Sequence, residues 1–237
     1  MTEFIHRGGD KTRQNQELFN AIAQRYDFLN HFLSLGLDLR WRRKLVQSLP
    51  AEIPGPVLDV ATGTGDLAFT ILKYRPDLEI IGVDNTPAML EIARRKMFEQ
   101  KRPYDTILSK AEELPFENDR FAALTIAFGL RNIGFYSSAL NEFQRVLKPG
   151  GTLLILEFGQ PTMPMFGTMF NFYFHCILPV IGALISSSKA YRYLPESVDR
   201  FPPRAELLEL VARAGFENPV LKNLTGGVVT LLRAEKA

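Results

Sequence analysis

Residues 57–66 read VLDVATGTGD, and residues 80–84 read IIGVD. Each apolar run ends at an acid, and the first opens into a turn of small residues that leads into an apolar helical stretch. This order predicts a strand, a tight loop, a helix and a second strand. Gly63 and Gly65 allow backbone N–H groups to approach a ligand closely. Asp84 lies about 20 residues past the glycines, where a ribose-binding acid belongs in a doubly wound sheet. We therefore predict a site for a nucleoside-containing cofactor.

Two classes of cofactor use this geometry. Residues 63–68 formally satisfy the dinucleotide fingerprint G-x-G-x-x-A. A pyrophosphate would lie at the start of the helix, however, where Asp59 and Asp66 would place negative charge beside it, and like charges repel at contact distance. S-adenosylmethionine (SAM) has no phosphate and carries an ammonium and a sulfonium. We therefore expect SAM, with Asp59 facing its amino group directly or through water and Asp84 binding both ribose hydroxyls. A dinucleotide is the alternative.

The order of the other predicted elements indicates an α/β fold. Strand and helix patterns alternate across residues 57–158, which is typical of a mostly parallel sheet. Two β-rich runs flank Gly226 and Gly227 and predict an antiparallel hairpin. We expect a seven-stranded, Rossmann-like sheet of the kind found in SAM-dependent methyltransferases. The later strands are expected around 105–109, 121–127, 152–158, 218–224 and 227–233, a turn at 148–151, and helices over 14–25, 40–48, 137–147 and 204–214.

An uncharged stretch interrupts this pattern. No Asp, Glu, Lys or Arg occurs between Phe158 and Ser188, a length that could span a bilayer. Pro161, Pro164 and Pro179 divide the stretch, and apolar pieces of about 12 residues suit a buried or interfacial helix pair. A membrane span, a core helix pair and a lid over an apolar substrate stay open. The position between a strand and the next helix, on the cofactor side of the sheet, favours the lid.

The predicted organisation is a single domain over 1–237. It consists of an N-terminal helical cap (1–50), a cofactor-binding core (56–158), an apolar lid insertion (159–203), and a terminal helix with the hairpin (204–237).

Composition limits the partners and the compartment. The chain has 28 Lys and Arg against 26 Asp and Glu, so a net charge of +2 gives no general attraction to nucleic acid. The basic cluster 40–44 around Trp41 suits either a solvated helix face or an anionic membrane surface.

Cys176 is the single cysteine, which excludes an intramolecular disulfide and suits a reducing compartment. The start of the chain lacks the pattern of a secretory signal. We expect a cytoplasmic protein peripherally associated with a membrane, and we leave a homodimer open.

Several further motifs occur along nearly the whole chain. They are YDFLN at 26–30 continuing through Ser34 to Trp41, FGLRN at 128–132, RVLKPGG at 145–151 continuing to Glu157, RYLPES at 192–197 and NLTGG at 223–227. Together they resemble the quinone C-methyltransferases, which methylate a ring carbon of ubiquinone, menaquinone or phylloquinone precursors. The first two motifs are specific to that family, whereas the cofactor loop alone is generic to SAM methyltransferases.

The chain departs from the family's pattern at four positions. Asp38 stands where His is usual, Gly159 where Ser is usual, Lys110 where an acid or Asn is frequent, and Ala127 where Ser is common. Taken together, these departures resemble the branch that acts on demethylphylloquinone. The resemblance therefore implies SAM-dependent C-methylation of demethylphylloquinol, the final methylation step of phylloquinone biosynthesis. A demethylmenaquinone or ubiquinone-precursor methyltransferase is the alternative.

The resemblance also implies which residues bind the cofactor. Because positions 110 and 127 line the adenine side in the family, adenine recognition is expected from the backbone of Ala111 and from Glu112. The full expected set is Asp59, Ala61, Thr62, Gly63, Thr64, Gly65, Asp84, Asn85, Lys110, Ala111, Glu112 and Ala127.

Methylation of a ring carbon requires an electron-rich acceptor. The hydroquinone must be the substrate, because loss of a hydroxyl proton makes the neighbouring carbon nucleophilic. Arg131 follows the predicted strand 121–127, so we expect it to stabilise the developing phenolate. Its alternative role is to bind loop carbonyls. Asn132 is expected to orient the substrate hydroxyl or a water.

The group that accepts the proton stays open. The candidates are Tyr26, Asp27 and His31 in the cap and His175 in the lid. No metal is expected, because three His and one Cys show no ligand spacing. The remaining alternative functions are a dinucleotide-dependent oxidoreductase and a non-catalytic lipid-binding protein.

Overall fold

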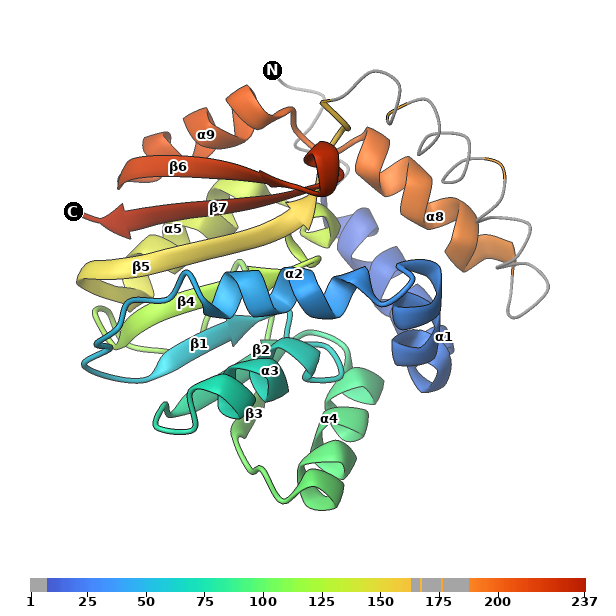
Figure 1. Cartoon of the computed structure of the whole chain (residues 1–237), viewed down its shortest axis with the longest axis horizontal. Coiled ribbons are helices and arrows are strands. Elements are labelled where there is room, and N and C mark those ends of the chain that lie inside the picture. Colours follow the sequence, from blue (N-terminus) through green and yellow to red (C-terminus); the bar gives the residue numbers. More distant parts are fainter. Residues whose placement is uncertain (1–7, 163–166, 168–175, 177–187) are drawn as a thin grey trace.

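The structure is a computed structural model that describes residues 8–162, 167, 176 and 188–237. Its centre is a seven-stranded sheet with the strand order β3-β2-β1-β4-β5-β7-β6 (Figure 1). The predicted seven-stranded α/β architecture is therefore confirmed. The strands are Val57–Val60 (β1), Ile80–Asp84 (β2), Asp105–Leu108 (β3), Phe121–Ala127 (β4), Leu147–Phe158 (β5), Phe216–Leu224 (β6) and Val229–Lys236 (β7).

The central strands are parallel and buried on both faces. β1 pairs with β2 on one side and with β4 on the other, and Val57 lies opposite both Ile80 and Ala123. Every residue of β1 and β2 is buried. Their nearly continuous apolar sequence follows from this burial, because a parallel strand between two helical layers has no solvated side. Asp59 and Asp84 are the acids of these two strands, so each carboxyl needs dedicated partners.

Helices cover both faces of the sheet. In Figure 1, α2 crosses in front of the sheet and α5 lies behind it. Leu45 of α2 and Val57 of β1 belong to one apolar layer, whereas Phe143 of α5 and Leu58 of β1 belong to the other. Alternate residues of one strand thus hold the two layers together. The helices are Gly8–Leu33 (α1), Leu37–Val46 (α2), Asp66–Tyr74 (α3), Pro87–Gln100 (α4), Tyr136–Val146 (α5), Ser188–Asp199 (α8) and Arg204–Arg213 (α9), with short 3₁₀ turns at Leu130–Asn132 (η2) and Thr225–Gly227 (η4).

The strand β5 differs from its predicted form. The turn expected at 148–151 lies inside β5, which begins at Leu147. Gly150 has φ +73°, and the pairing of β4 with β5 shifts in register between Phe121 and Ala123. An irregularity of this kind lets a strand continue through a sequence that otherwise reads as a turn.

The C-terminal hairpin is confirmed, with one refinement. β7 is antiparallel to both of its neighbours, β5 and β6. The antiparallel strand is therefore internal to the sheet, and β6 forms the edge. Gly215 has φ +90° and follows the end of α9, where a left-handed residue commonly ends a helix.

The cap extends further than the predicted helix 14–25. α1 covers Gly8–Leu33 and packs on α4 through Ala23, Met89 and Ile92. Of the predicted lid 159–203, the structure describes the two ends, and α8 lies against η2. The apolar helix pair predicted within 163–187 falls outside the described residues, apart from positions 167 and 176. Within the described ranges, no helix has the length and hydropathy needed to cross a membrane.

Replacing Phe143 with Ala should lower the free energy of unfolding by about 3–5 kcal/mol, because truncation of a large core side chain leaves a cavity. Phe143 is fully buried, at 0% exposure. Urea denaturation measures the change. Phe98→Ala is the matched control, because Phe98 on α4 is 87% exposed, and this variant should differ from the wild type by less than about 0.5 kcal/mol. Equal losses in the two variants would contradict the packing described here.

Candidate active site

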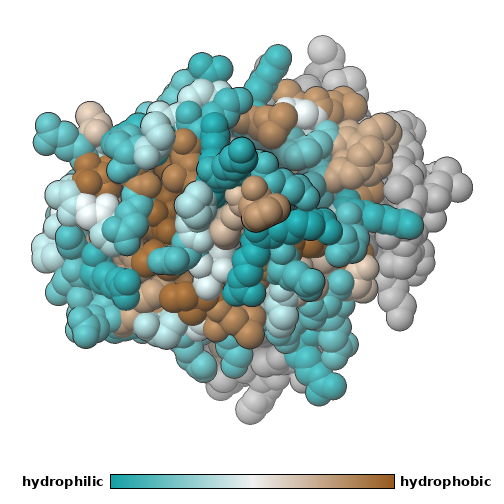
Figure 2. Space-filling view, turned by 90° about the horizontal axis from the view of Figure 1, so that it is seen from below, coloured by the Kyte–Doolittle hydropathy of each residue, from teal (hydrophilic) through white to brown (hydrophobic). Residues whose placement is uncertain are grey.

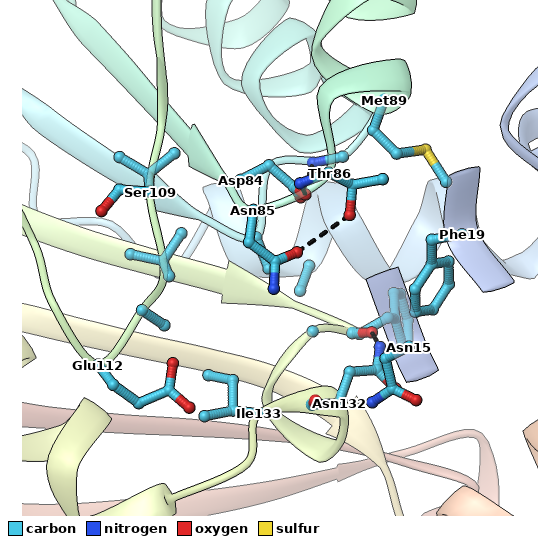
Figure 3. A pocket seen from close by; sticks show the side chains of 18 of the residues that line it. Asn15, Phe19, Asp84, Asn85, Thr86, Met89, Ser109, Glu112, Asn132 and Ile133 are labelled. Atoms are coloured by element: carbon cyan, nitrogen blue, oxygen red, sulfur yellow. Dashed lines mark hydrogen bonds between the residues drawn. The ribbon is translucent and has the colours of Figure 1, made fainter. Parts of the chain in front are cut away.

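A pocket opens at the carboxyl ends of β1, β2 and β4. This edge is where the strand order reverses between β1 and β4, the usual ligand position in an open α/β sheet. Its empty volume, including the mouth, is about 690 Å³, within the roughly 300–1,000 Å³ of small-molecule sites. Helix α1 closes the far side (Figure 3). The lining residues are Asn15, Phe19, Tyr26, Val60, Ala61, Gly63, Val83, Asp84, Asn85, Thr86, Met89, Ser109, Ala111, Glu112, Ala127, Phe128, Gly129, Asn132 and Ile133.

The loop after β1 has a left-handed backbone at three positions. Ala61, Gly63 and Gly65 have φ of +52°, +57° and +87°. A side chain on Gly63 would meet nothing closer than the Ala61 carbonyl oxygen at 4.0 Å, so the space above Gly63 is open to a ligand. A Cβ on Gly65 would lie 2.2 Å from the Tyr104 hydroxyl. The open space at Gly63 is compatible with the predicted close approach of a ligand, which stays a prediction, whereas Gly65 makes room for Tyr104.

Asp84 is held rigidly at the end of β2. Its two carboxylate oxygens accept the backbone N–H groups of Gly63 and Thr86, each at 2.8 Å. Burial raises the pKa of this carboxyl, and the two backbone hydrogen bonds oppose that rise. The Thr86 side chain and the Asn85 backbone also act on this carboxyl and oppose the rise in its pKa. Asp84 therefore lines the pocket as a fixed acceptor, in the position predicted for binding ribose hydroxyls.

The next wall of the pocket is formed after β2 and β3. Asn85 lines it as predicted, and its side-chain oxygen accepts the Thr86 hydroxyl at 3.0 Å (Figure 3). Ala111 and Glu112 also line it, and Glu112 accepts the N–H of Gly134 at 3.2 Å. Ala127, also expected on the adenine side, lies in the lining as well.

Lys110 differs from the prediction. Its side chain is 54% exposed and lies 4.0 Å from the Glu113 carboxylate, and it is not among the residues that line the pocket. The chain turns at this point, so Ala111 and Glu112 face the pocket and Lys110 faces solvent. Lys110 stands where the family has an acid or Asn, but in this chain the pocket wall is formed by Ala111 and Glu112.

Asp59 lies beneath the loop and does not line the pocket. Its carboxylate accepts the hydroxyls of Thr62 at 2.7 Å and Thr125 at 2.9 Å. Burial raises the pKa of Asp59 to about 7. Asp59 therefore supports the loop through Thr62, which is itself buried behind the lining. Its predicted contact with a cofactor amino group stays a prediction.

The carboxylate of Asp66 is paired inside the protein. It lies 2.6 Å from the Lys96 ammonium and 3.5 Å from the Arg42 guanidinium. The pKa of Asp66 is lowered, because these two cations outweigh the burial that would raise it. The prediction that Asp59 and Asp66 present two free negative charges to a ligand is therefore wrong, since one is hydrogen-bonded and buried and the other is ion-paired.

The side of the pocket formed by α1 is aromatic and amide-rich. The rings of Phe19 and Tyr26 meet edge to face at 5.8 Å. Asn15 donates to the Asn132 carbonyl oxygen at 2.8 Å, and the Tyr193 hydroxyl donates to the Asn132 side-chain oxygen at 2.7 Å. Burial raises the pKa of Tyr26. Asn132 is thus fixed from two separate segments, as its predicted role in orienting a substrate requires.

Arg131 is buried behind this wall and is not part of the lining. Its Nη1 donates to the Glu157 carboxylate and to the Phe128 carbonyl oxygen, both at 2.6 Å. These contacts match the alternative role, in which the side chain binds the loop. Its Nε is buried and has no hydrogen-bond partner among the described residues. Direct stabilisation of a phenolate by Arg131 stays a prediction.

The candidate proton acceptors are separated by the structure. Asp27 accepts the Thr64 hydroxyl and lies 2.9 Å from the Lys96 ammonium, outside the pocket. The Nδ1 atom of His31 lies 2.7 Å from the Asp38 carboxylate, also outside the pocket lining. Tyr26 does line it. His175 falls outside the described residues.

The described residues bring together one group that could ligate a metal by distance alone. One ligand atom each from His31, Asp38 and Asp66 lies within 4.8 Å of the others. Arg42 donates to Asp38 and lies beside Asp66. The two acids therefore already face a guanidinium.

Several pocket residues were not predicted from the sequence. Asn15, Phe19, Met89 and Ser109 line the pocket. The apolar spacing of residues 14–25 and of the helix after Thr86 placed Phe19 and Met89 on helices, but it did not distinguish a core face from a pocket face. Nothing in the sequence around Ser109 indicated its position.

The chain matches known proteins over nearly its whole length. The model of the ubiE/COQ5 methyltransferase family matches residues 8–236. The ubiquinone/menaquinone biosynthesis C-methyltransferase UbiE of Syntrophotalea carbinolica is 45% identical over 95% of this chain and 94% of its own. The demethylmenaquinone methyltransferase of Thermus thermophilus is 48% identical over 84% of this chain and 91% of its own.

Solved structures share the fold at lower identity. A SAM-dependent methyltransferase of Thermotoga maritima has a TM-score of 0.65 at 21% identity, covering 93% of this chain and 99% of its own. The cyclase SpnF has a TM-score of 0.72 at 17% identity, covering 95% of this chain and 96% of its own. Since these two proteins are named for different reactions, the shared fold does not by itself specify the chemistry.

Asp84→Asn should weaken binding of S-adenosylhomocysteine by about 10- to 100-fold. The change removes a charged acceptor and turns an amide N–H₂ toward the N–H of Gly63 or Thr86, and a hydrogen bond to a charged group contributes roughly 1.5–3 kcal/mol. Isothermal titration calorimetry measures the affinity. Asp105→Asn, at an exposed position on β3, is the control and should bind as the wild type does. Unchanged affinity in Asp84→Asn would remove Asp84 from the cofactor site.

Asp59→Asn should change the pH dependence of stability. The folded-state pKa of Asp59 is raised from 3.8 to about 7, so the folded protein holds this proton more tightly than the unfolded chain. The stability that Asp59 contributes is complete below about pH 4 and is lost as the pH rises through about 7. Asparagine does not ionise, so the variant should gain stability relative to the wild type across this window and no further above it. Urea unfolding at a series of pH values measures the difference, and a constant difference would contradict the assignment.

Proposed function

The chain belongs to the ubiE/COQ5 methyltransferase family, and from that membership we propose that it methylates a ring carbon of a prenylated naphthoquinol. The coarser function, SAM-dependent C-methylation of a quinone, is that of the family and its relatives. The observation that carries the proposal is a single cavity with two chemically different sides. One side, around Asp84, suits a nucleoside, and the other, around Phe19 and Tyr26, suits an aromatic ring.

The residues present fit SAM on one side of the pocket. The Asp84 carboxylate lines the pocket as an acceptor that ribose hydroxyls would meet, and the open space above Gly63 admits a ligand close to the loop backbone. Ala111, Glu112 and Ile133 would hold the adenine between apolar groups and an acid. SAM supplies a methyl group on a sulfonium, which becomes neutral as the methyl group leaves.

The other side of the pocket supports the quinol. Phe19 and Phe128 offer aromatic surface, whereas Asn132 and Tyr26 offer hydrogen bonds. The raised pKa of Tyr26 keeps its hydroxyl protonated at neutral pH, so we propose that it donates a hydrogen bond to the phenolate oxygen and does not act as the base. With Asn132 orienting the second ring oxygen, the acceptor carbon would be held toward the methyl donor.

Arg131 supports this side from behind. By binding Glu157 and the Phe128 carbonyl oxygen, it fixes the turn that carries Asn132. Its buried charge also lowers the pKa of Tyr26, against the larger effect of burial. We propose that Arg131 acts on the substrate through Tyr26 and Asn132, as a positioning residue.

The tail of the quinol is the finer part of the proposal. The departures at Asp38, Lys110, Ala127 and Gly159 favour a phytylated precursor, demethylphylloquinol. The names of the relatives favour the polyprenyl precursor, demethylmenaquinol. Both share one naphthoquinol ring, and an apolar site separates tails that differ by a methylene by only about 1–3 kcal/mol. We also propose peripheral attachment to the cytoplasmic surface of the membrane that carries the quinone.

The test compares three acceptors with SAM as donor: demethylphylloquinol, demethylmenaquinol and the benzoquinol precursor of ubiquinone. Chromatography with mass spectrometry measures the C-methylated product. If the naphthoquinol proposal holds, both naphthoquinols should react with a kcat/KM at least about tenfold above that of the benzoquinol, because the second fused ring adds apolar contact that a single ring lacks. The oxidised quinones are the control and should give no product, because their rings are electrophilic.

The outcomes separate the levels of the proposal. A higher kcat/KM for one of the two naphthoquinols would show whether the phytyl or the polyprenyl tail is preferred. Faster reaction of the benzoquinol would overturn the naphthoquinol assignment while leaving methyl transfer intact. Product from the oxidised quinones would overturn the hydroquinone mechanism.

A further inference from the structure

The surface mixes hydrophilic and hydrophobic side chains, as Figure 2 shows for the face seen from below. Single exposed apolar residues are ordinary on a soluble protein, so a binding surface requires that they cluster. One such cluster falls within residues 28–39. Phe28 is 59% exposed, Phe32 47%, Leu35 79% and Leu39 52%. We call these four residues the apolar corner, because they lie where α1 turns into α2.

The apolar corner lies on a helix face that should be polar. The inner face of α1 carries Phe19, Ala23 and Tyr26, which pack on α4 or line the pocket. Phe28 is two residues past Tyr26, a rotation of about 200° around the helix, so it points away from the core. The rings of Phe28 and Phe32 stack at 5.7 Å with 12° between their planes. Nothing in the fold of the described residues requires two stacked phenyl rings on this outer face.

The backbone holds Leu35 outward. Leu35 has φ +53° and is the most exposed of the four residues. A left-handed residue commonly ends an α-helix, and at the end of α1 this position is taken by leucine, where glycine is usual. The turn is fixed by hydrogen bonds from Leu35 to Phe32 and from Gly36 to His31. An exposed leucine side chain is not stabilised by water, whereas its transfer into an apolar phase lowers the free energy.

The charges of α2 beside the apolar corner have one sign at the surface. Asp27, which precedes Phe28, is partly exposed and is ion-paired with Lys96 at 2.9 Å. On α2, Arg40, Arg43 and Lys44 are exposed on the same helical face as Leu39. The acid in the segment 28–47 is Asp38, which is 3% exposed and ion-paired with Arg42. The exposed surface of this segment is therefore apolar at its tip and positive along its side.

We propose that the apolar corner and the adjacent basic face of α2 dock on an anionic lipid bilayer. The side chains of the apolar corner would enter the boundary between headgroups and acyl chains, while Arg40, Arg43 and Lys44 contact lipid phosphates. The proposal rests on the proposed function for its purpose, since a quinol with a long tail resides in the bilayer. Helix α1 would then contribute to catalysis and to membrane binding, because its inner face lines the pocket and its outer face would meet the membrane.

A second copy of the chain is a poorer occupant. A stable protein pair buries roughly 1,200–2,000 Å² in total, far more than four partly exposed side chains provide. Two copies meeting here would also bring Arg40, Arg43 and Lys44 of one close to those of the other, and like charges repel. On an anionic surface the same basic residues would face negative charges and would be attracted to them.

Flotation with lipid vesicles tests the proposal on the full chain. The vesicles are phosphatidylcholine alone, or phosphatidylcholine with one third phosphatidylglycerol. Wild-type protein should bind the anionic vesicles more tightly, and added salt should weaken that binding because it screens the basic residues. The double variant Phe28→Ser, Phe32→Ser should lower the partition coefficient at least about tenfold, because two apolar anchors are lost. Phe98→Ser is the matched control, since Phe98 is exposed on α4, and it should float as the wild type does.

A soluble assay keeps this test separate from the proposed function. The Phe28, Phe32 double variant should methylate a short-tailed, water-soluble naphthoquinol at the wild-type rate, which also shows that it folds. If the wild type fails with that acceptor, the proposed function fails, whatever the vesicles show. Wild-type flotation of the double variant would overturn the docking surface. A wild-type dimer that becomes monomeric in the double variant, with vesicle binding unchanged, would assign the corner to a second copy instead.

Discussion

The active site depends on a small network of charges that joins the N-terminal cap to the cofactor loop. Lys96 on α4 lies between the carboxylates of Asp27 on α1 and Asp66 at the start of α3, at 2.9 and 2.6 Å. Arg42 on α2 adds a second cation beside Asp66. These groups are largely removed from water, so each would be costly alone, and pairing offsets the desolvation. Because α1 carries one entire side of the pocket, the network determines where the acceptor side sits relative to the donor side.

The same network explains which parts of the site could be read from sequence. The strand ends were predicted closely, and with them Asp84, because strand periodicity and the position of an acid after an apolar run are local signals. The fate of Asp66 was not local. Its partners Arg42 and Lys96 come from helices before and after it in the chain, and no spacing rule brings them to α3. Arg131 is a similar case. Its partner Glu157 lies on β5, which follows α5 in the chain. The position of Arg131 after a predicted strand suggests a role at the substrate but does not reveal this contact.

The choice of SAM over a dinucleotide shows how a right conclusion can rest on a faulty premise. The sequence argument assumes that two carboxylates near the helix start repel a pyrophosphate, yet Asp59 is buried with a raised pKa and Asp66 is ion-paired. Neither presents a free charge to the pocket. The family supports SAM independently, and the structural argument now rests on Asp84 and on the open space above Gly63. The sequence shows where an acidic residue stands in the chain, but its burial and its partners determine whether the carboxyl presents a charge to a ligand.

The sheet itself contributes little to the choice of acceptor. A cyclase and a methyltransferase share it with this chain at TM-scores of 0.72 and 0.65, and in all α/β folds of this kind the strands position a crevice without naming its ligand. What differs must lie in the elements added around the crevice. Here these are α1, η2 and α8, which meet where Tyr193 donates to Asn132 and Asn15 donates to the backbone of the same residue. Asn132 thus receives contacts from a helix near each end of the chain. Helix α1 also reaches the donor side, where Asp27 accepts the Thr64 hydroxyl and Gln16 donates to the Asn85 carbonyl oxygen. A change in α8 would therefore act on the acceptor side through Asn132, whereas a change in α1 would act on both sides of the pocket.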